Sequence, residues 1–163
     1  MSPQMPLHNL QIETIHLDNI HGTTVILDID GTITADGQVE CSSGVLATLR
    51  DLAARNNVYL GSNHQNRARN RAIARRIGCF CIETPHLKPN SKVFEAIPAC
   101  HRTQPIVVIG DKYLVDGLFA RRIGALFIKV GRITSTDDRT FVKVAYFLDD
   151  LVSTIAGWLD RPR

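Results

Sequence analysis

The chain has 163 residues, of which 44% are hydrophobic and 21% charged, a composition that excludes a disordered or fibrous protein. Its length suits one domain with a substantial core, so we predict a single domain over residues 1–163, with residues 1–20 an N-terminal segment of uncertain structure. The net charge of +3 permits anionic ligands, and no nucleic acid is expected as a partner. We find no signal-peptide pattern and no apolar run of membrane-spanning length, and we therefore expect a cytoplasmic protein.

Strand-like and helix-like patterns alternate from about residue 20 onward. Apolar, β-branched runs predict strands at residues 23–29, 57–61, 79–83, 105–109 and 125–130. Apolar residues at helical spacing predict helices at residues 43–55, 65–77, 90–100, 114–123 and 138–159. The last helix is expected to pack on the core. This alternation predicts an α/β fold, a three-layer Rossmann-like parallel sheet with helices on both faces, which binds its ligands at the carboxyl ends of the strands.

Two carboxylates, Asp28 and Asp30, directly follow the first predicted strand in the run DIDGT. Two charges at the end of a buried strand are costly unless each has a partner, and a divalent cation with hard oxygen ligands, such as Mg²⁺, would supply one. Such a pair also suits phosphoryl transfer, with one carboxylate as nucleophile and the other as acid and base. The alternatives are two solvated carboxylates in a turn, or a calcium loop. The calcium loop fails because Gly31 is at the fourth position of the run and not the sixth.

Polar residues also stand beside the later strands. Ser62 and Asn63 follow the second strand and could bind phosphate oxygens or cap the next helix. Lys88 precedes a helix and could neutralise a phosphate or be an ordinary surface lysine. Asp111 and Asp116 follow the fourth strand and could bind a metal or form an acidic first turn. Each signal alone is weak, but together they point to one edge of the sheet.

In this order of motifs the sequence resembles the haloacid dehalogenase (HAD) superfamily of phosphatases over roughly residues 20–130. The four motifs of that superfamily match DIDGT, Ser62, Lys88 and GDKYLVD. The finer resemblance is to subfamily IIIA, which includes phosphatidylglycerophosphate-phosphatase-like proteins, through LGSNHQ, LKPN and VVIGDKYLVDGLFARRIGALFIKV. The chain departs from that branch at Gly31, where it often has Asn, and at Lys112 and Val115, where it usually has Gln and Thr.

The resemblance implies a Mg²⁺-dependent phosphatase that hydrolyses a phosphate monoester through an aspartyl-phosphate intermediate. It implies that Asp28 is the nucleophile and Asp30 the general acid and base. The metal ligands that it implies are Asp28, the Asp30 carbonyl group, Asp111 and, in support, Asp116. For substrate binding it implies Ser62 and Lys88, to which we add Thr32 and Asn63.

The motifs leave no room for a cap domain. The 31 residues between Asp30 and Ser62 are used by one helix and one strand, as are the 25 residues between Ser62 and Lys88. The HAD-like fold should therefore be capless and its site open, unless a neighbouring subunit covers it. An open site suits a large or membrane-surface phosphate ester. Phosphatidylglycerophosphate is the substrate that the resemblance implies, a phosphosugar or nucleotide is the alternative, and a receiver-like or non-catalytic phosphate-binding module is the competing class.

Five arginines lie on the predicted helix at 65–77: Arg67, Arg69, Arg71, Arg75 and Arg76. Because they are spread around the helix, we interpret them as a solvated face in preference to a site for anionic lipid. The expected partner is a phosphorylated small molecule or a lipid head group. Peripheral membrane contact and assembly into a homo-oligomer both stay open.

Overall fold

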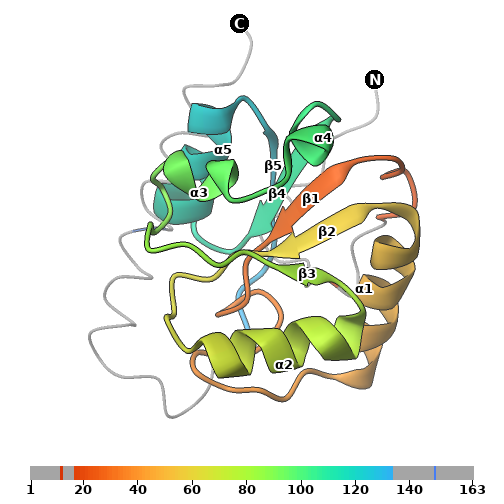
Figure 1. Ribbon diagram of the computed structural model, residues 1–163. Helices are drawn as coiled ribbons and strands as arrows, with labels where there is room; N and C mark the ends of the chain where they lie inside the picture. The colour runs from red at the N-terminus through yellow and green to blue at the C-terminus, as the bar shows by residue number, and fades with distance from the viewer. Residues whose placement is uncertain (1–11, 13–16, 134–148, 150–163) are drawn as a thin grey trace, which may run out of the picture.

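The computed structural model describes Ile12, residues 17–133 and Asp149. Five strands form one sheet in the order β3-β2-β1-β4-β5, and every neighbouring pair is parallel (Figure 1). The strands are β1 (Thr24–Leu27), β2 (Asn57–Leu60), β3 (Phe80–Cys81), β4 (Ile106–Gly110) and β5 (Leu126–Lys129). This confirms the predicted parallel α/β sheet. The predicted helix at 138–159 and most of residues 1–20 lie outside the described residues.

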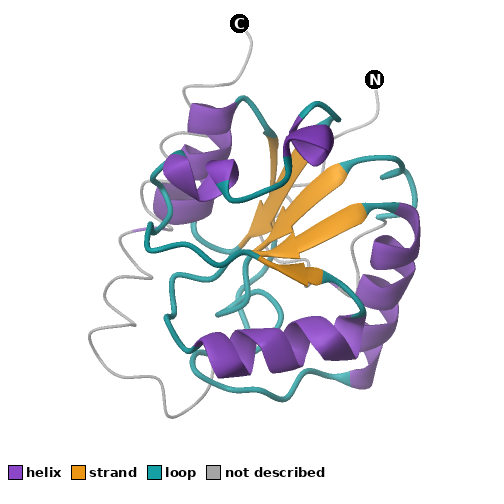
Figure 2. Cartoon of the chain, viewed as in Figure 1, coloured by secondary structure: helices purple, strands orange, loops and turns teal. Residues whose placement is uncertain are grey.

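The helical elements connect these strands (Figure 2). They are α1 (Ser43–Arg55), α2 (Arg67–Ile77), α3 (Lys92–Glu95), α4 (Ala99–Arg102), the π-helical turn η3 (Tyr113–Gly117) and α5 (Leu118–Ile123). Helix α1 begins where the Ser42 side chain accepts a hydrogen bond from the Val45 N–H. Helix α2 ends at Gly78, whose φ of 84° places it in the left-handed region that glycine tolerates. No helix of the described part is long and apolar enough to cross a membrane.

The prediction of one helix over residues 90–100 is wrong, because the structure has two short helices there. Helix α3 ends at Glu95, and α4 starts only at Ala99. Pro98 lies between them with a ψ of 141°, outside the helical range. Proline has no N–H for a helical hydrogen bond, and its ring clashes with the preceding turn. The helix therefore stops before Pro98 and restarts after it.

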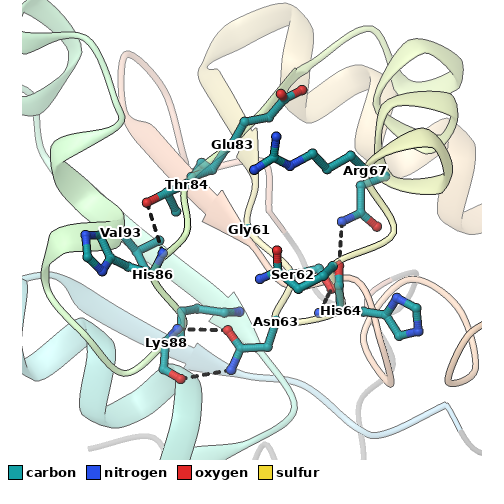
Figure 3. A pocket seen from close by; sticks show the side chains of 13 residues that line it. Gly61, Ser62, Asn63, His64, Arg67, Glu83, Thr84, His86, Lys88 and Val93 are labelled. Atoms are coloured by element: carbon teal, nitrogen blue, oxygen red, sulfur yellow. Dashed lines mark hydrogen bonds between the residues drawn. The ribbon is translucent and has the colours of Figure 1, made fainter.

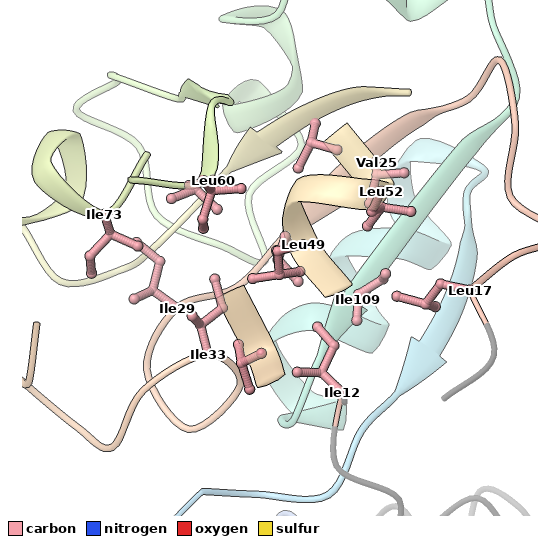
Figure 4. Close-up of a cluster of buried hydrophobic side chains, with 14 of the residues drawn as sticks. Ile12, Leu17, Val25, Ile29, Ile33, Leu49, Leu52, Leu60, Ile73 and Ile109 are labelled. Atoms are coloured by element: carbon pink, nitrogen blue, oxygen red, sulfur yellow. The ribbon is translucent and has the colours of Figure 1, made fainter. Parts of the chain in front are cut away.

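Two hydrophobic clusters cover the two faces of the sheet and make the fold three-layered. On one face, Val25 and Leu27 of β1 pack in a cluster with residues of α1 and α2, such as Leu49 and Ile73 (Figure 4). On the other face, Ile26 packs in a cluster that includes residues of α3 and α5. Successive side chains of a strand point to opposite faces, so the continuous apolar run of β1 serves both clusters. The predicted layers are confirmed.

The segment before β1 also contributes to the core. Ile12 and Leu17 are 0% and 4% exposed and belong to the cluster on the face of α1 and α2. Figure 4 shows them beside Ile109 of β4. At least two residues of the N-terminal segment are therefore part of the fold.

The order of the strands places a switch point between β1 and β4. The chain runs from β1 to β2 and β3 on one side, then crosses back to β4 and β5 on the other. Leu27 pairs with Ile109, and the N–H of Asp28 donates to the Ile109 carbonyl at 2.9 Å. In open parallel sheets, ligands bind at the carboxyl ends of strands at such a point. Across residues 17–133 no further domain is inserted between these elements, so the described fold is capless.

Candidate active site

The loop after β1 brings two carboxylates to the switch point. Asp28 and Asp30 are 5% and 7% exposed, while Ile29 between them is buried in the core. Gly31 then turns the chain with a φ of +88°. A Cβ at this position would lie 2.6 Å from Oδ2 of Asp111, so the loop and Asp111 approach each other this closely only with glycine. Gly31, one of the positions at which the chain departs from the branch that it resembles, therefore allows Asp111 to lie this close to the loop.

Lys88 joins two of the carboxylates in the buried part of the site. Its Nζ lies 2.7 Å from Oδ1 of Asp28 and 2.5 Å from Oδ1 of Asp116. Burial alone would lower the pKa of the Lys88 ammonium, but Asp116 and Asp28 outweigh burial and raise it. Lys88 therefore stays protonated and places a positive charge beside Asp28.

Asn63 holds the backbone of Lys88. Its Oδ1 accepts from the Lys88 N–H and its Nδ2 donates to the Lys88 carbonyl, both at 2.8 Å (Figure 3). The two bonds connect the loop after β2 to the loop before α3. The structure thus gives Asn63 a part in positioning Lys88, while its predicted contact with substrate stays a prediction.

Asp116 lies deepest in the cluster, at 0% exposure. Burial raises the pKa of its carboxyl, and the negative charges of Asp28 and Asp111 raise it further, against the attraction of Lys88. A Cβ on Gly110 would lie 2.4 Å from Cγ of Asp116, so the end of β4 needs glycine to admit this side chain.

Asp30 is held by donors on both oxygens. Its Oδ1 accepts from Nη2 of Arg69 at 2.8 Å and from the Gly37 N–H at 3.0 Å. Its Oδ2 accepts from Ser62 Oγ at 2.8 Å and from Nη1 of Arg69 at 3.2 Å. Burial would raise the pKa of Asp30, but the bonds from Arg69, Gly37 and Ser62 outweigh it and lower the pKa. Asp30 is therefore ionised in this structure.

Asp111 is also paired on both oxygens. Its Oδ1 lies 3.3 Å from the Thr32 Oγ1 donor and 3.2 Å from Nζ of Lys112. Its Oδ2 accepts from Nε of Arg132 at 2.5 Å. Thr32 is 0% exposed and faces Asp111, so the structure shows it supporting a carboxylate. A substrate contact of Thr32 stays a prediction.

The donor set fits a hard divalent cation. Asp28, Asp111 and Asp116 each offer an oxygen, and these oxygens lie within 4.8 Å of one another. The Asp30 carbonyl points to the same place, because Nζ of Lys112 lies 2.8 Å from it, 3.2 Å from Asp111 and 3.9 Å from Oδ2 of Asp28. Oxygen ligands in this number suit Mg²⁺, and the Lys112 ammonium already shows that a cation fits among them.

An open cavity of about 290 Å³ gives access to this cluster. It is lined by Asp28, Asp30, Asp36, Asn63, His64, Lys112 and Val115. A narrow cavity of about 20 Å³, room for a single water molecule, lies beside the loop of Ser62 and Asn63 (Figure 3). A small phosphate ester could therefore reach Asp28 and Asp30 through the wide cavity.

The interpretation of the arginines as a solvated face is wrong for Arg69. This side chain is 3% exposed and forms an ion pair with Asp30. Arg71, on the same helix, pairs with Glu83 at the surface. The sequence pattern did not separate the two, because Asp30 is 39 residues from Arg69 and only the packing of α2 on the loop after β1 brings them together.

Arg132 and Asp149 were also missed as residues of the site. Arg132 pairs with Asp111, and Asp149 accepts from the N–H groups of Tyr113 and Leu114 at 2.9 and 2.7 Å. Asp149 therefore holds the start of η3, the turn that carries Asp116. Neither residue lies in a motif, and no spacing signal would have singled them out.

Comparison with known proteins assigns the family. No curated protein and no solved structure matches the chain. The family model described as mitochondrial PGP phosphatase matches residues 3–132, most of the chain. That span contains the acidic loop after β1, Ser62, Lys88 and the acidic turn after β4. The chain therefore belongs to this PGP phosphatase family, a HAD-like family of phosphatases.

Proposed function

We propose that this phosphatase is Mg²⁺-dependent and hydrolyses a phosphate monoester through an aspartyl-phosphate on Asp28. The observation that carries the proposal is the environment of Asp28. The carboxylate lines the open cavity, while the buried Lys88 ammonium lies 2.7 Å from its Oδ1. A nucleophile must be within reach of the substrate, and the position of Asp28 on the cavity wall meets this condition.

The reaction would proceed in two steps. An oxygen of Asp28 forms a bond to phosphorus while the bond from phosphorus to the ester oxygen breaks, and the leaving oxygen takes a proton. Water then attacks phosphorus, loses a proton, and frees Asp28 and inorganic phosphate. Mg²⁺ bound by Asp28, Asp111 and the Asp30 carbonyl, with Asp116 in support, would neutralise charge on the transferred group.

Asp30 is proposed to move the protons in both steps. The ionised form, which Arg69, Gly37 and Ser62 stabilise, is the form that can accept a proton from the attacking water. To donate a proton in the first step, Asp30 must first take one up, and this requires its ion pair with Arg69 to loosen. Ser62 would then be free to turn from Asp30 toward a phosphate oxygen.

The substrate that we propose is phosphatidylglycerophosphate. The family match and the open, capless site support it, since a phosphate on a lipid head group at a membrane surface needs an uncovered entrance. Cytoplasmic location and peripheral membrane contact remain part of this proposal. Phosphosugars and nucleotides are the alternatives that a substrate screen would separate.

Release of phosphate tests the mechanism. The purified protein is assayed with Mg²⁺ or EDTA on an aryl phosphate, phosphatidylglycerophosphate in detergent micelles, a hexose phosphate and a nucleoside monophosphate. We expect activity that EDTA abolishes and that Asp28→Asn lowers by at least about a thousandfold, since a covalent step is lost. Asp51→Asn, an exposed carboxylate of α1, is the control and should keep its activity. Activity that persists in Asp28→Asn would rule the mechanism out.

A further inference from the structure

Lys112 places a positive charge where the proposed Mg²⁺ would bind. Its Nζ donates to the Asp30 carbonyl at 2.8 Å and to Oδ1 of Asp111 at 3.2 Å, and lies 3.9 Å from Oδ2 of Asp28. These oxygens belong to three of the ligands assigned to the metal. An ammonium group and a divalent cation cannot occupy the same position among them.

Each buried carboxylate of the described site already has a protein cation within ion-pair distance. The five buried carboxylates of the described residues are Asp28, Asp30, Asp111, Asp116 and Asp149. Among the described residues, the cations that lie within ion-pair distance of them are Arg69, Lys88, Lys112, Lys129 and Arg132. A buried cluster whose charges are paired gains less from an added cation than one with an excess of negative charge. Mg²⁺ would therefore bind more readily if one of these cations left.

Lys112 is the cation best able to leave. Its side chain is 24% exposed, whereas those of Arg69, Lys88, Lys129 and Arg132 are 3%, 1%, 14% and 10% exposed. It also lines the open cavity of about 290 Å³, so its flexible stem has room to turn toward solvent.

From this geometry we infer that Lys112 is a tethered cation that competes with the divalent metal for the oxygens of Asp28, Asp30 and Asp111. The inference rests on the proposed function, because it takes the metal site from it. With the metal absent, the ammonium keeps the ligands together and neutralised. When the metal binds, the side chain moves into the cavity. Lys112 thus lowers the affinity of the site for Mg²⁺ without being one of its ligands.

Metal affinity, measured without substrate, tests the inference. Mg²⁺ binding by calorimetry and Mn²⁺ binding by electron paramagnetic resonance are compared for the unmodified chain, Lys112→Gln and Lys112→Met. Both variants remove the charge, and Met keeps most of the apolar stem. We expect either variant to bind both metals about tenfold more tightly, since the metal no longer has to break charge-assisted hydrogen bonds. Thermal unfolding in EDTA shows whether each variant is folded. One folded variant is enough to test the inference.

Two control variants separate the position of the charge from its mere presence. Lys112→Arg keeps a cation at the site and should bind metal as the unmodified chain does, or more weakly. Lys92→Gln removes an exposed charge on α3, away from the cluster, and should leave affinity unchanged. Equal or weaker affinity in Lys112→Gln and Lys112→Met overturns the inference, as does an absence of metal binding in all variants.

The outcomes also separate this inference from the proposed function. If Lys112→Gln binds metal more tightly but no variant releases phosphate from any ester, the competition stands and the proposed reaction fails. If phosphate release depends on Asp28 and Mg²⁺ while affinity does not depend on Lys112, the reaction stands and the competition fails.

Discussion

The ion pair between Arg69 and Asp30 is the clearest case in which one residue of the site depends on another far along the chain. Arg69 donates to both oxygens of Asp30, and its Nε donates to the Gln38 carbonyl at 2.8 Å. Taking two charges out of water is costly, so such a pair adds little net stability, but losing one partner leaves the other charge buried and unpaired.

Replacing Arg69 with Met should therefore destabilise the fold by about 3 kcal/mol, because Asp30 is left as an uncompensated buried carboxylate. Urea unfolding followed by circular dichroism measures the change. In the double variant Asp30→Asn with Arg69→Met, the buried charge is gone, and we expect part of the loss to be recovered. Arg71→Met, also on α2, breaks a surface ion pair with Glu83 and should change the midpoint of urea unfolding much less. Equal effects of the two single variants would contradict the prediction.

At the scale of elements, local signals explain why most of the fold could be predicted. Apolar, β-branched runs predict all five strands to within two residues at each end, and apolar residues at helical spacing predict the bounds of α1. The start of α2 was placed less well, because Asn66, and neither Ser62 nor Asn63, caps it. Both failures, here and at Pro98, concern helix ends, where one hydrogen bond decides between neighbouring positions.

The free energy that one such hydrogen bond contributes can be measured at the cap of α1. Ser42→Ala removes the side-chain oxygen that accepts from the Val45 N–H at 3.1 Å, and it should lower the free energy of unfolding by about 1 kcal/mol. Ser43→Ala, at the first helical position, is the matched control, and its expected effect is within about 0.5 kcal/mol. Denaturant unfolding of both variants gives the comparison, and an equal loss at both positions would show that Ser42 is not the cap.

The site was less predictable than the elements, for a physical reason. Motif order could bring together Asp28, Ser62, Lys88 and Asp111, because the carboxyl ends of parallel strands share one edge. Two of the cations that pair with the carboxylates, Arg69 and Arg132, come from segments outside the motifs. Arg69 is 39 residues from the Asp30 carboxylate that it contacts, and such a contact exists only once α2 has packed on the loop after β1.

Across the whole molecule, the two hydrophobic clusters offset the free-energy cost of burying charged side chains at the carboxyl ends of the strands. The sheet carries apolar side chains on both faces of β1, and the larger cluster also takes in Ile12 and Leu17 from the segment before it. Asp28 and Asp111 directly follow β1 and β4, so the pairing of these two strands fixes the positions of both residues. The site depends on this frame, since a shift of one strand would separate its ligands.

The contribution of the N-terminal segment to this frame can be tested at Ile12. The side chain is 0% exposed within the cluster on the face of α1 and α2, so Ile12→Ala leaves a cavity and should lower the free energy of unfolding by about 2–4 kcal/mol. Val39→Ala, at a side chain that is 40% exposed, is the control and should stay within about 0.5 kcal/mol. Both are measured by urea unfolding of the full chain. If Ile12→Ala shifts the midpoint no more than Val39→Ala does, the segment before β1 does not belong to the cooperative core. A loss of about 2–4 kcal/mol would show that the core extends beyond the strands and helices that carry the site.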